Sequence, residues 1–241
     1  MRVLILSDIH ANWAVLEAVL RAELTVDRII CLGDLVNYGP QPAECVDWAL
    51  QVAKAGNLFL QGNHDHAVGL GADPRCSSSY RLLALTMQKI TIQLTSKKQK
   101  EFLSTLQPLR QFVLGEHRCV ACHATPRDAL FTYLPKDATT SEWEEEIAAA
   151  GSPDYLFVGH THVPMKLKIG KTIVINPGSV GQPKNHDPRA SYVLWEDGKI
   201  TFHAVDYDVE ATIHAYRGLG LEAGVASPLF NVLRSGGKFA A

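Results

Sequence analysis

Carboxylate, imidazole and amide side chains recur in five short segments in the first two thirds of the chain. The segments are Asp8-Ile9-His10, Gly33-Asp34, Gly62-Asn63-His64-Asp65, His123 and Gly159-His160-Thr161-His162. Oxygen and imidazole ligands without thiolate suit divalent ions such as Mn²⁺, Fe²⁺ and Zn²⁺. The candidate ligands number seven, which is more than one ion needs, so the pattern favours two divalent ions.

A short apolar run that predicts a buried strand precedes each of these segments. The runs are Val3–Leu6, Arg28–Leu32, Leu58–Leu60, Cys119–Ala121 and Tyr155–Val158, and Thr172–Ile175 adds a sixth strand. In open α/β sheets the ligand site lies beyond the carboxyl ends of the strands. We therefore expect five strands to deliver the polar side chains to one sheet edge.

The spacing within the segments has a geometric interpretation. Asp8/His10 and His160/His162 are i, i+2 pairs, and on extended backbone both members of such a pair face the same side. A glycine stands before three of the candidate ligands. We expect these glycines to turn the chain sharply and to keep Cβ atoms out of a crowded centre.

Amphipathic segments between and after the strands predict helices, which makes the chain an α/β protein. The helices are expected after Asn12, from Pro42, over Tyr80–Leu94, over Ser96–Leu106, from Ser141 toward Gly151, and from near Asp208. The stretch Ser191–Asp206 predicts a hairpin about the Asp197-Gly198 turn, and hence a mixed sheet. We expect one domain over residues 1–241, with a poorly ordered tail after about Ala226.

The five segments, in this order, resemble the calcineurin-like metallophosphoesterase family over about residues 1–182. The small bacterial phosphodiesterase/phosphatase branch of that family is similar also in Asp8–Asn12, Tyr38-Gly39-Pro40 and Asn176–Val180. This resemblance implies the metallophosphoesterase fold, a four-layer αββα sandwich of mixed β-sheets, with a binuclear metal centre. By the family pattern, Asp8, His10 and His162 hold one ion, Asn63, His123 and His160 hold the other, and Asp34 bridges both. The expected ions are Mn²⁺, with Fe, Zn, Ni or Co as the other candidates.

The same resemblance implies a hydrolase that cleaves phosphodiester or phosphomonoester bonds with metal-activated hydroxide. His64 is then the catalytic residue that assists the leaving group or the phosphoryl oxygens, and Asp65 orients it. Side chains that flank the segments are candidates for binding the substrate: Asn12, Tyr38, Arg127, Tyr133 and Lys184. The expected partner is a small phosphoester or a nucleotide.

Other functions stay open at this point. Within the family, the chain could be a dinucleoside polyphosphate (diadenosine tetraphosphate-type) hydrolase or a protein phosphatase. A metal-binding scaffold protein is a different class, but the intact Asn63-His64-Asp65 favours an enzyme. A nuclease would want a basic groove, whereas 23 Lys and Arg against 25 Asp and Glu give a net charge of −2.

Composition sets the remaining expectations. The chain has 241 residues with 46% hydrophobic content, and it contains no apolar run long enough for a transmembrane helix. Its five cysteines are an odd number, which favours a reducing compartment, and we expect a cytoplasmic protein. Cys119 and Cys122 are i, i+3 on a strand and point to opposite faces, so we interpret them as buried hydrophobes. Residues 69–115 are expected to pack beside the site as helices, where they could cap it or form a dimer surface.

Overall fold

Ten strands form two mixed five-stranded sheets in the computed structural model, which describes residues 1–76 and 78–237. The first sheet has the spatial order β10 (Lys199–Val205), β9 (Ala190–Glu196), β1 (Arg2–Leu6), β2 (Arg28–Cys31) and β3 (Leu58–Phe59). The second has the order β4 (Leu109–Leu114), β5 (His117–Cys122), β6 (Tyr155–Phe157), β8 (Thr172–Asn176) and β7 (Met165–Ile169). In each sheet three neighbouring strands run parallel, namely β1, β2 and β3 in the first and β5, β6 and β8 in the second.

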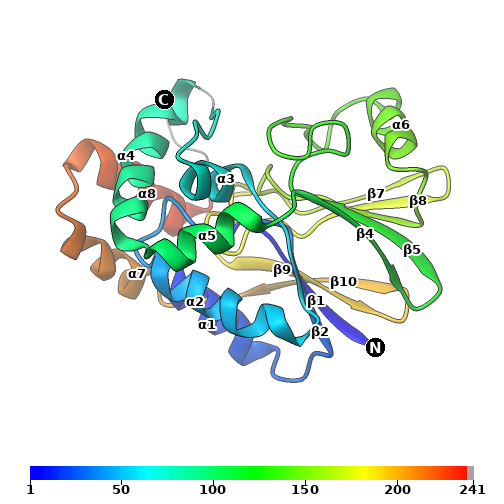
Figure 1. Ribbon diagram of the computed structural model, residues 1–241, viewed down its shortest axis with the longest axis horizontal. Helices are drawn as coiled ribbons and strands as arrows, with labels where there is room; N and C mark the ends of the chain where they lie inside the picture. Colours follow the sequence, from blue (N-terminus) through cyan, green and yellow to red (C-terminus); the bar gives the residue numbers. More distant parts are fainter. Residues whose placement is uncertain (77, 238–241) are drawn as a thin grey trace.

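The helices lie on the outer faces of the two sheets and at one end of the molecule (Figure 1). Those in the described residues are α1 (Trp13–Ala22), α2 (Pro42–Val52), α3 (Asn63–Leu70), α4 (Ser78–Leu94), α5 (Lys97–Thr105), α6 (Thr140–Ala149), α7 (Val209–Tyr216) and α8 (Ala223–Ser235), with short 3₁₀ turns at Ala53–Ala55 and Arg217–Leu219. Helix α6 covers the second sheet, on the opposite side of the molecule from α1 and α2 (Figure 1). Of the helices described, none is both long and apolar enough to cross a membrane.

Alternation along the strands explains the layers. In β1, Val3 and Ile5 point into a core between the two sheets, while Leu4 and Leu6 point into a second core beneath α1 and α2. On the outer face of the second sheet, Trp143 of α6 packs on a third core. The layers are therefore helix, sheet, sheet, helix, which confirms the predicted αββα sandwich.

Strand β5 shows the same alternation at its two cysteines. Cys119 belongs to the core between the sheets, whereas Cys122 belongs to the core beneath α6. Both side chains are buried and both are free thiols. The prediction that the pair occupies opposite faces as small hydrophobes is confirmed.

The expectation of a poorly ordered tail after Ala226 is wrong for the residues that the structure describes. Helix α8 continues to Ser235 and buries Leu229, Val232 and Leu233. Leu229 and Leu233 join a fourth core with α4 and α7. These apolar residues stand at i, i+3 and i+4, which is helical spacing, among small and polar residues that obscured it. Residues 238–241 of the expected tail lie outside the described residues.

Because α8 completes a core, truncating it should destabilise the whole fold. We expect Leu229→Ala, at a side chain only 2% exposed, to lower the free energy of unfolding. The loss should be about 2–5 kcal/mol, as for other buried leucines. Leu82→Ala in α4 is the matched control, since Leu82 is 76% exposed. Chemical denaturation measures both, and equal free energies of unfolding for the two variants would contradict the packing of α8.

Candidate metal centre

Two groups of metal-ligand side chains converge where the carboxyl ends of the two sets of parallel strands meet. The first group is Asp8, His10 and His162, and the second is Asp34, His123 and His160. Within each group the ligand atoms lie within 4.8 Å of one another. The groups draw on loops after β1 and β2 of one sheet and after β5 and β6 of the other. The structure thus brings the predicted ligands together, at the meeting edge of two sheets rather than at the edge of one.

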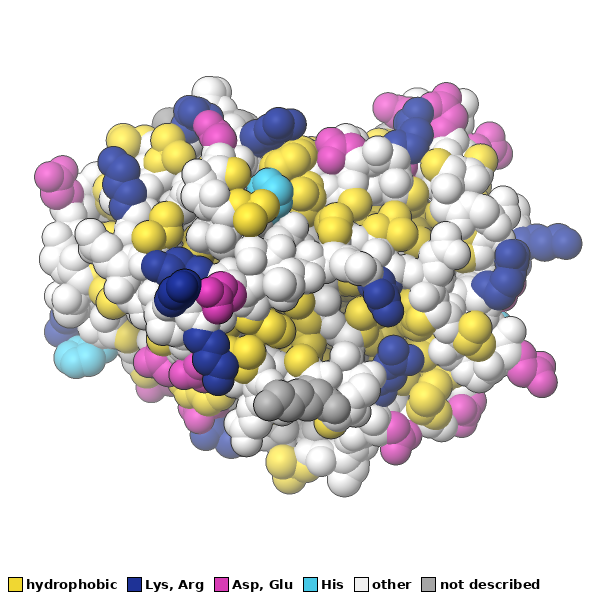
Figure 2. Space-filling model, in the orientation of Figure 1, with side chains coloured by type: hydrophobic (Ala, Val, Ile, Leu, Met, Phe, Trp, Pro, Cys, Tyr) yellow, Lys and Arg dark blue, Asp and Glu magenta, His cyan; other side chains and the backbone are white. Residues whose placement is uncertain are grey.

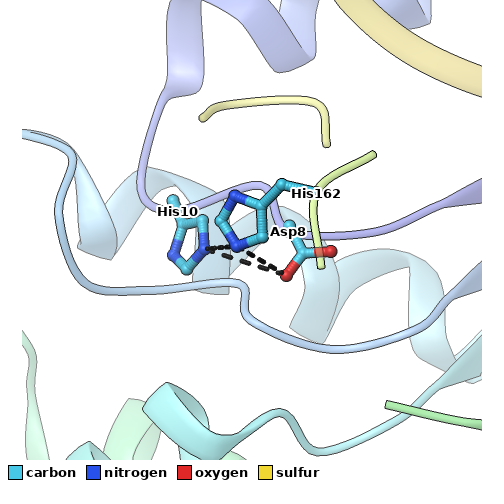
Figure 3. A group of neighbouring side chains, drawn as sticks. All are labelled: Asp8, His10 and His162. Atoms are coloured by element: carbon cyan, nitrogen blue, oxygen red, sulfur yellow. Dashed lines mark hydrogen bonds and ion pairs between the residues drawn. The ribbon is translucent and has the colours of Figure 1, made fainter. Parts of the chain in front are cut away.

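The first group is a triangle of donor atoms (Figure 3). Asp8 Oδ1 lies 3.3 Å from His162 Nε2 and 3.8 Å from His10 Nε2. The two Nε2 atoms are 3.2 Å apart. All three side chains are buried, so bulk water contributes little to their solvation.

Asn63, the first residue of α3, lies beside the second group. His123 Nε2 lies 3.3 Å from Asp34 Oδ2 and 3.2 Å from Asn63 Oδ1. Asp34 Oδ2 also lies 3.7 Å from His10 Nε2 of the first group. One carboxylate oxygen therefore faces both groups.

The histidine tautomers leave lone pairs at the centre. Nδ1 of His10, His123 and His162 donates to the backbone carbonyls of Val36, Leu32 and Gln182, at 3.1, 2.9 and 2.6 Å respectively. In a neutral ring, an Nδ1 that donates in this way leaves Nε2 as the acceptor, which is how metal-binding histidines are oriented. Burial lowers the pKa of His10 to about 3, and it lowers the pKa of His160 and His162 well below the usual value. These rings are therefore neutral, the form that binds metal.

Unpaired oxygens complete the donor set. Asp8 Oδ1 and Asp34 Oδ2 are buried, and within the described part of the chain neither has a hydrogen-bond partner. A buried carboxylate oxygen and two imidazole lone pairs at such short separations repel one another unless a cation lies among them. The donors fit divalent ions of the manganese, iron or zinc type.

Two groups carry pKa shifts in the direction that opposes metal binding. Burial raises the pKa of Asp8 to about 6, and the charge of Asp34 adds to the rise. For His123, burial favours the neutral ring, but the adjacent Asp34 outweighs it and raises the pKa to about 9. A cation at the second group must therefore displace a proton from His123.

The backbone at the centre is not extended, contrary to the sequence-based expectation. Asp8, His10, Asp34, His160 and His162 all have positive φ, between 48° and 64°. This left-handed conformation is uncommon outside glycine and concentrates at functional sites. The pair Asp8/His10 still serves one group, but His160 and His162 diverge to different groups.

The glycines that precede ligands do keep the centre open, as predicted. A Cβ at Gly33, whose φ is +104°, would lie 2.9 Å from His123 Nδ1. At Gly62 a Cβ would collide with the Asp34 carboxylate, and at Gly159 it would collide with Ser7 Oγ.

His64 lies beside the ligand groups, in the first turn of α3. Its backbone N–H donates to Asp34 Oδ1 at 2.9 Å, and its ring Nδ1 contacts Asn37 Nδ2 at 2.6 Å. Asn37 Oδ1 accepts from the Tyr38 N–H, so the Asn37 amide nitrogen is the donor and His64 Nδ1 the acceptor. The proton of a neutral His64 is then on Nε2, which faces Cys76 Sγ at 3.6 Å.

Asp65 does not have the position predicted for it. Its carboxylate accepts backbone N–H groups of Asp34, Leu35, Val36 and Gly62, at 2.8 to 3.3 Å. Asp65 therefore shapes the loop that carries Asp34, and Asn37 orients the His64 ring instead. The sequence shows that a carboxylate, Asp65, stands two positions after Asn63, but it does not show which backbone N–H groups that carboxylate accepts from.

A cavity of about 310 Å³ opens beside the two groups. Of the predicted substrate residues, Tyr38, Tyr133 and Lys184 line it. Asn12 and Arg127 are not among its described lining residues. Asn12 Oδ1 caps α1 by accepting from the Val15 N–H, and it also accepts from Thr212 Oγ1. Arg127 forms ion pairs with Glu145 and Glu146 of α6. The lining residues that the sequence did not single out are Arg75, Cys76, Tyr80 and Phe131.

The fold and this centre define a metallophosphoesterase class of protein, and comparison with known proteins agrees. Residues 1–198 match the calcineurin-like phosphoesterase superfamily domain, and the chain belongs to that superfamily.

Three relatives illustrate the similarity. An uncharacterized protein of Methanocaldococcus jannaschii is 31% identical over 227 residues, which cover 86% of this chain and 88% of that protein. The phosphodiesterase YfcE of Escherichia coli is 26% identical over 208 residues, with coverage of 86% and 93%. The crystal structure of a metallophosphoesterase from Sphaerobacter thermophilus superposes with a TM-score of 0.79 at 32% identity, over 98% of this chain and 99% of that one.

The raised pKa of His123 makes metal binding pH-dependent. At neutral pH the metal-free protein carries the His123 proton, because its pKa is about 9. Mn²⁺ titrations by calorimetry, in buffers of different ionisation enthalpy, should therefore show release of about one proton. The release should fade as the pH rises through 9, and His123→Asn should remove it. Proton-neutral binding by the unmodified protein at neutral pH would contradict the assignment.

Proposed function

We propose that this phosphoesterase is a hydrolase with a binuclear metal centre that cleaves phosphodiester or phosphomonoester bonds. The observation that supports two ions most directly is the position of Asp34 Oδ2, which faces His10 of one group and His123 of the other. Its second oxygen is held by the His64 N–H, so the shared oxygen has a fixed direction. A carboxylate placed in this way suits a bridge between two cations.

The residues divide into two ligand sets. Asp8, His10 and His162 would hold one ion; Asn63, His123 and His160 would hold the other; and Asp34 would be shared by both. When bound, the ions polarise the phosphoryl group and supply an activated water as nucleophile. Asn63 Nδ2 donates to the Pro74 carbonyl at 2.8 Å, which leaves its Oδ1 directed at the second set. We expect Mn²⁺ as the native metal, with Fe, Zn, Ni or Co as the other candidates.

His64 is the proposed catalytic residue of the protein itself. Because Asn37 occupies Nδ1, His64 holds its proton at Nε2, on the cavity side. Burial lowers the pKa of His64, but the negative charges of the Cys76 thiolate and of Asp34 outweigh burial and raise it. The Nε2–H can therefore donate a hydrogen bond to a phosphoryl oxygen or to the leaving oxygen.

The substrate class is argued from the relatives and the surface. YfcE is a phosphodiesterase, which supports a diester as substrate. A dinucleoside polyphosphate hydrolase and a protein phosphatase are the alternatives within the family. On the face in Figure 2, basic and acidic side chains are interspersed and do not segregate into a basic groove, which does not favour a nuclease. All five cysteines are free thiols, which supports the proposal of a cytoplasmic location.

The bridging role of Asp34 gives a direct metal-binding test. Asp34→Asn should weaken both ions together, each by at least about tenfold, since the bridge is shared. Mn²⁺ titration by calorimetry measures both affinities, and Asp206→Asn at an exposed position is the matched control. A variant that keeps one site at its original affinity would refute the bridge.

The catalytic role of His64 is tested by separating metal binding from turnover. We expect metal-stripped protein refilled with Mn²⁺ to hydrolyse bis(p-nitrophenyl) phosphate and p-nitrophenyl phosphate, and the ratio of rates indicates diesterase or monoesterase. His64→Ala should keep both ions and lose about 10²–10⁴-fold in kcat. His214→Ala, at an exposed histidine, should match the unmodified protein.

Two results would count against this function. If His64→Ala loses metal but keeps its activity per bound ion, His64 is a structural residue. If the unmodified protein binds two ions and hydrolyses neither ester, the scaffold function becomes the better explanation.

A further inference from the structure

The cavity wall beyond the metal ligands is aromatic and cationic. Tyr80, Phe131 and Tyr133 contribute rings, and Arg75 and Lys184 contribute positive charge. The Arg75 guanidinium carbon lies 4.5 Å from the centre of the Phe131 ring, and Lys184 Nζ lies 4.9 Å from the centre of the Tyr80 ring. Both cations are thus held over aromatic faces at the mouth of the site.

This wall adjoins the proposed reaction centre. The Tyr133 ring packs edge-on at 5.8 Å from the His160 ring, and the Tyr133 hydroxyl donates to the Thr161 carbonyl at 3.4 Å. Tyr133 is nevertheless 48% exposed, so much of its ring faces outward. A phosphoester bound at the ligand groups would therefore extend its organic group along Tyr133 and toward Phe131.

We propose that Arg75, Tyr80, Phe131 and Tyr133 form a leaving-group subsite for a nucleotide ester, with a base against the rings and a further phosphate against Arg75. The proposal rests on the proposed function and specifies its substrate class. The rings provide flat apolar surface on which every nucleobase stacks. The guanidinium provides paired N–H donors that match phosphate oxygens.

The charge of the cavity favours an anion with more than one phosphate. Of the described residues that line the cavity, Asp34 is the one that has a carboxylate, and this carboxylate would bind the ions. Arg75 and Lys184 then add positive charge to a centre that is already cationic once loaded. A polyol phosphate offers no flat group that could stack on an aromatic wall, and a volume of about 310 Å³ suits a small molecule better than a folded phosphoprotein segment.

The stacking part of the proposal is tested by binding, independently of turnover. The protein is the His64→Ala variant loaded with Mn²⁺, in which hydrolysis is slow, and calorimetry compares adenosine 5′-monophosphate with ribose 5-phosphate. These probes differ only in the base, and we expect the first to bind about tenfold more tightly. Adding Tyr133→Leu should abolish most of this preference, while Tyr133→Phe, which keeps the ring, should retain it. Equal affinity for the two probes would overturn the proposal.

The phosphate part uses adenosine 5′-diphosphate against the monophosphate in the same background. Arg75→Gln should weaken binding of the diphosphate by about tenfold and binding of the monophosphate by less, because a charge-assisted pair between the guanidinium and the second phosphate is lost. Arg21→Gln, at a side chain 71% exposed on α1, is the matched control and should change neither. An Arg75→Gln variant that binds both nucleotides as before would remove Arg75 from the subsite.

The outcomes separate this inference from the proposed function. Base-dependent binding by a protein that hydrolyses neither nitrophenyl ester supports the subsite and rejects the enzyme. Hydrolysis of the esters with no preference for the base supports the enzyme and overturns the subsite. Unchanged Mn²⁺ stoichiometry in every variant confirms that the effects arise in the cavity wall.

Discussion

The carboxylate of Asp34 is the interaction on which the site depends. One oxygen accepts the N–H of His64 where α3 begins, and the other faces His10 and His123. The backbone N–H of Asp34 is in turn held by Asp65. The loops after β2 and β3 are therefore locked to each other through these carboxylates. Because His123 follows a strand of the second sheet, Asp34 also connects the two sheets at the point where they meet.

This arrangement concentrates unfavourable terms in a small volume. In the metal-free protein, the buried carboxylate oxygens lack hydrogen bonds and the imidazole lone pairs lie close to them, and both features cost free energy. The left-handed backbone at five ligands adds a conformational cost. The two sheets and their cores hold these residues in place, since strands fixed on both faces leave the loops little freedom. Divalent cations would offset the electrostatic part, so the fold prepares the site and the ions stabilise it.

Features that depend on local sequence could be predicted, whereas features that depend on tertiary packing could not. The inner strands are continuous apolar runs and were found, as was the hairpin at Asp197-Gly198. The edge strands β4 and β7 were missed because polar residues such as Arg110 and Lys168 interrupt them. The types of the ligands and their order along the chain could be predicted from the sequence. The positive φ values and the backbone partners of Asp65 could not, because they arise only from tertiary packing. The same holds for Arg75 and Phe131, which lie far apart in the chain and meet only in the fold.

Asn37 decides how the site can use His64. A carboxylate at this position would accept from Nδ1–H and stabilise the charged ring, whereas the amide of Asn37 donates to Nδ1 and places the proton of a neutral ring on Nε2. The amide is itself fixed, because its oxygen accepts from the Tyr38 N–H and its nitrogen also donates to the Ala84 carbonyl at 3.2 Å. His64 thus presents a directed N–H to the cavity without needing a net charge. Under the proposed binuclear function, a neutral donor would assist the phosphoryl group while adding no further repulsion to the positive charge of the ions.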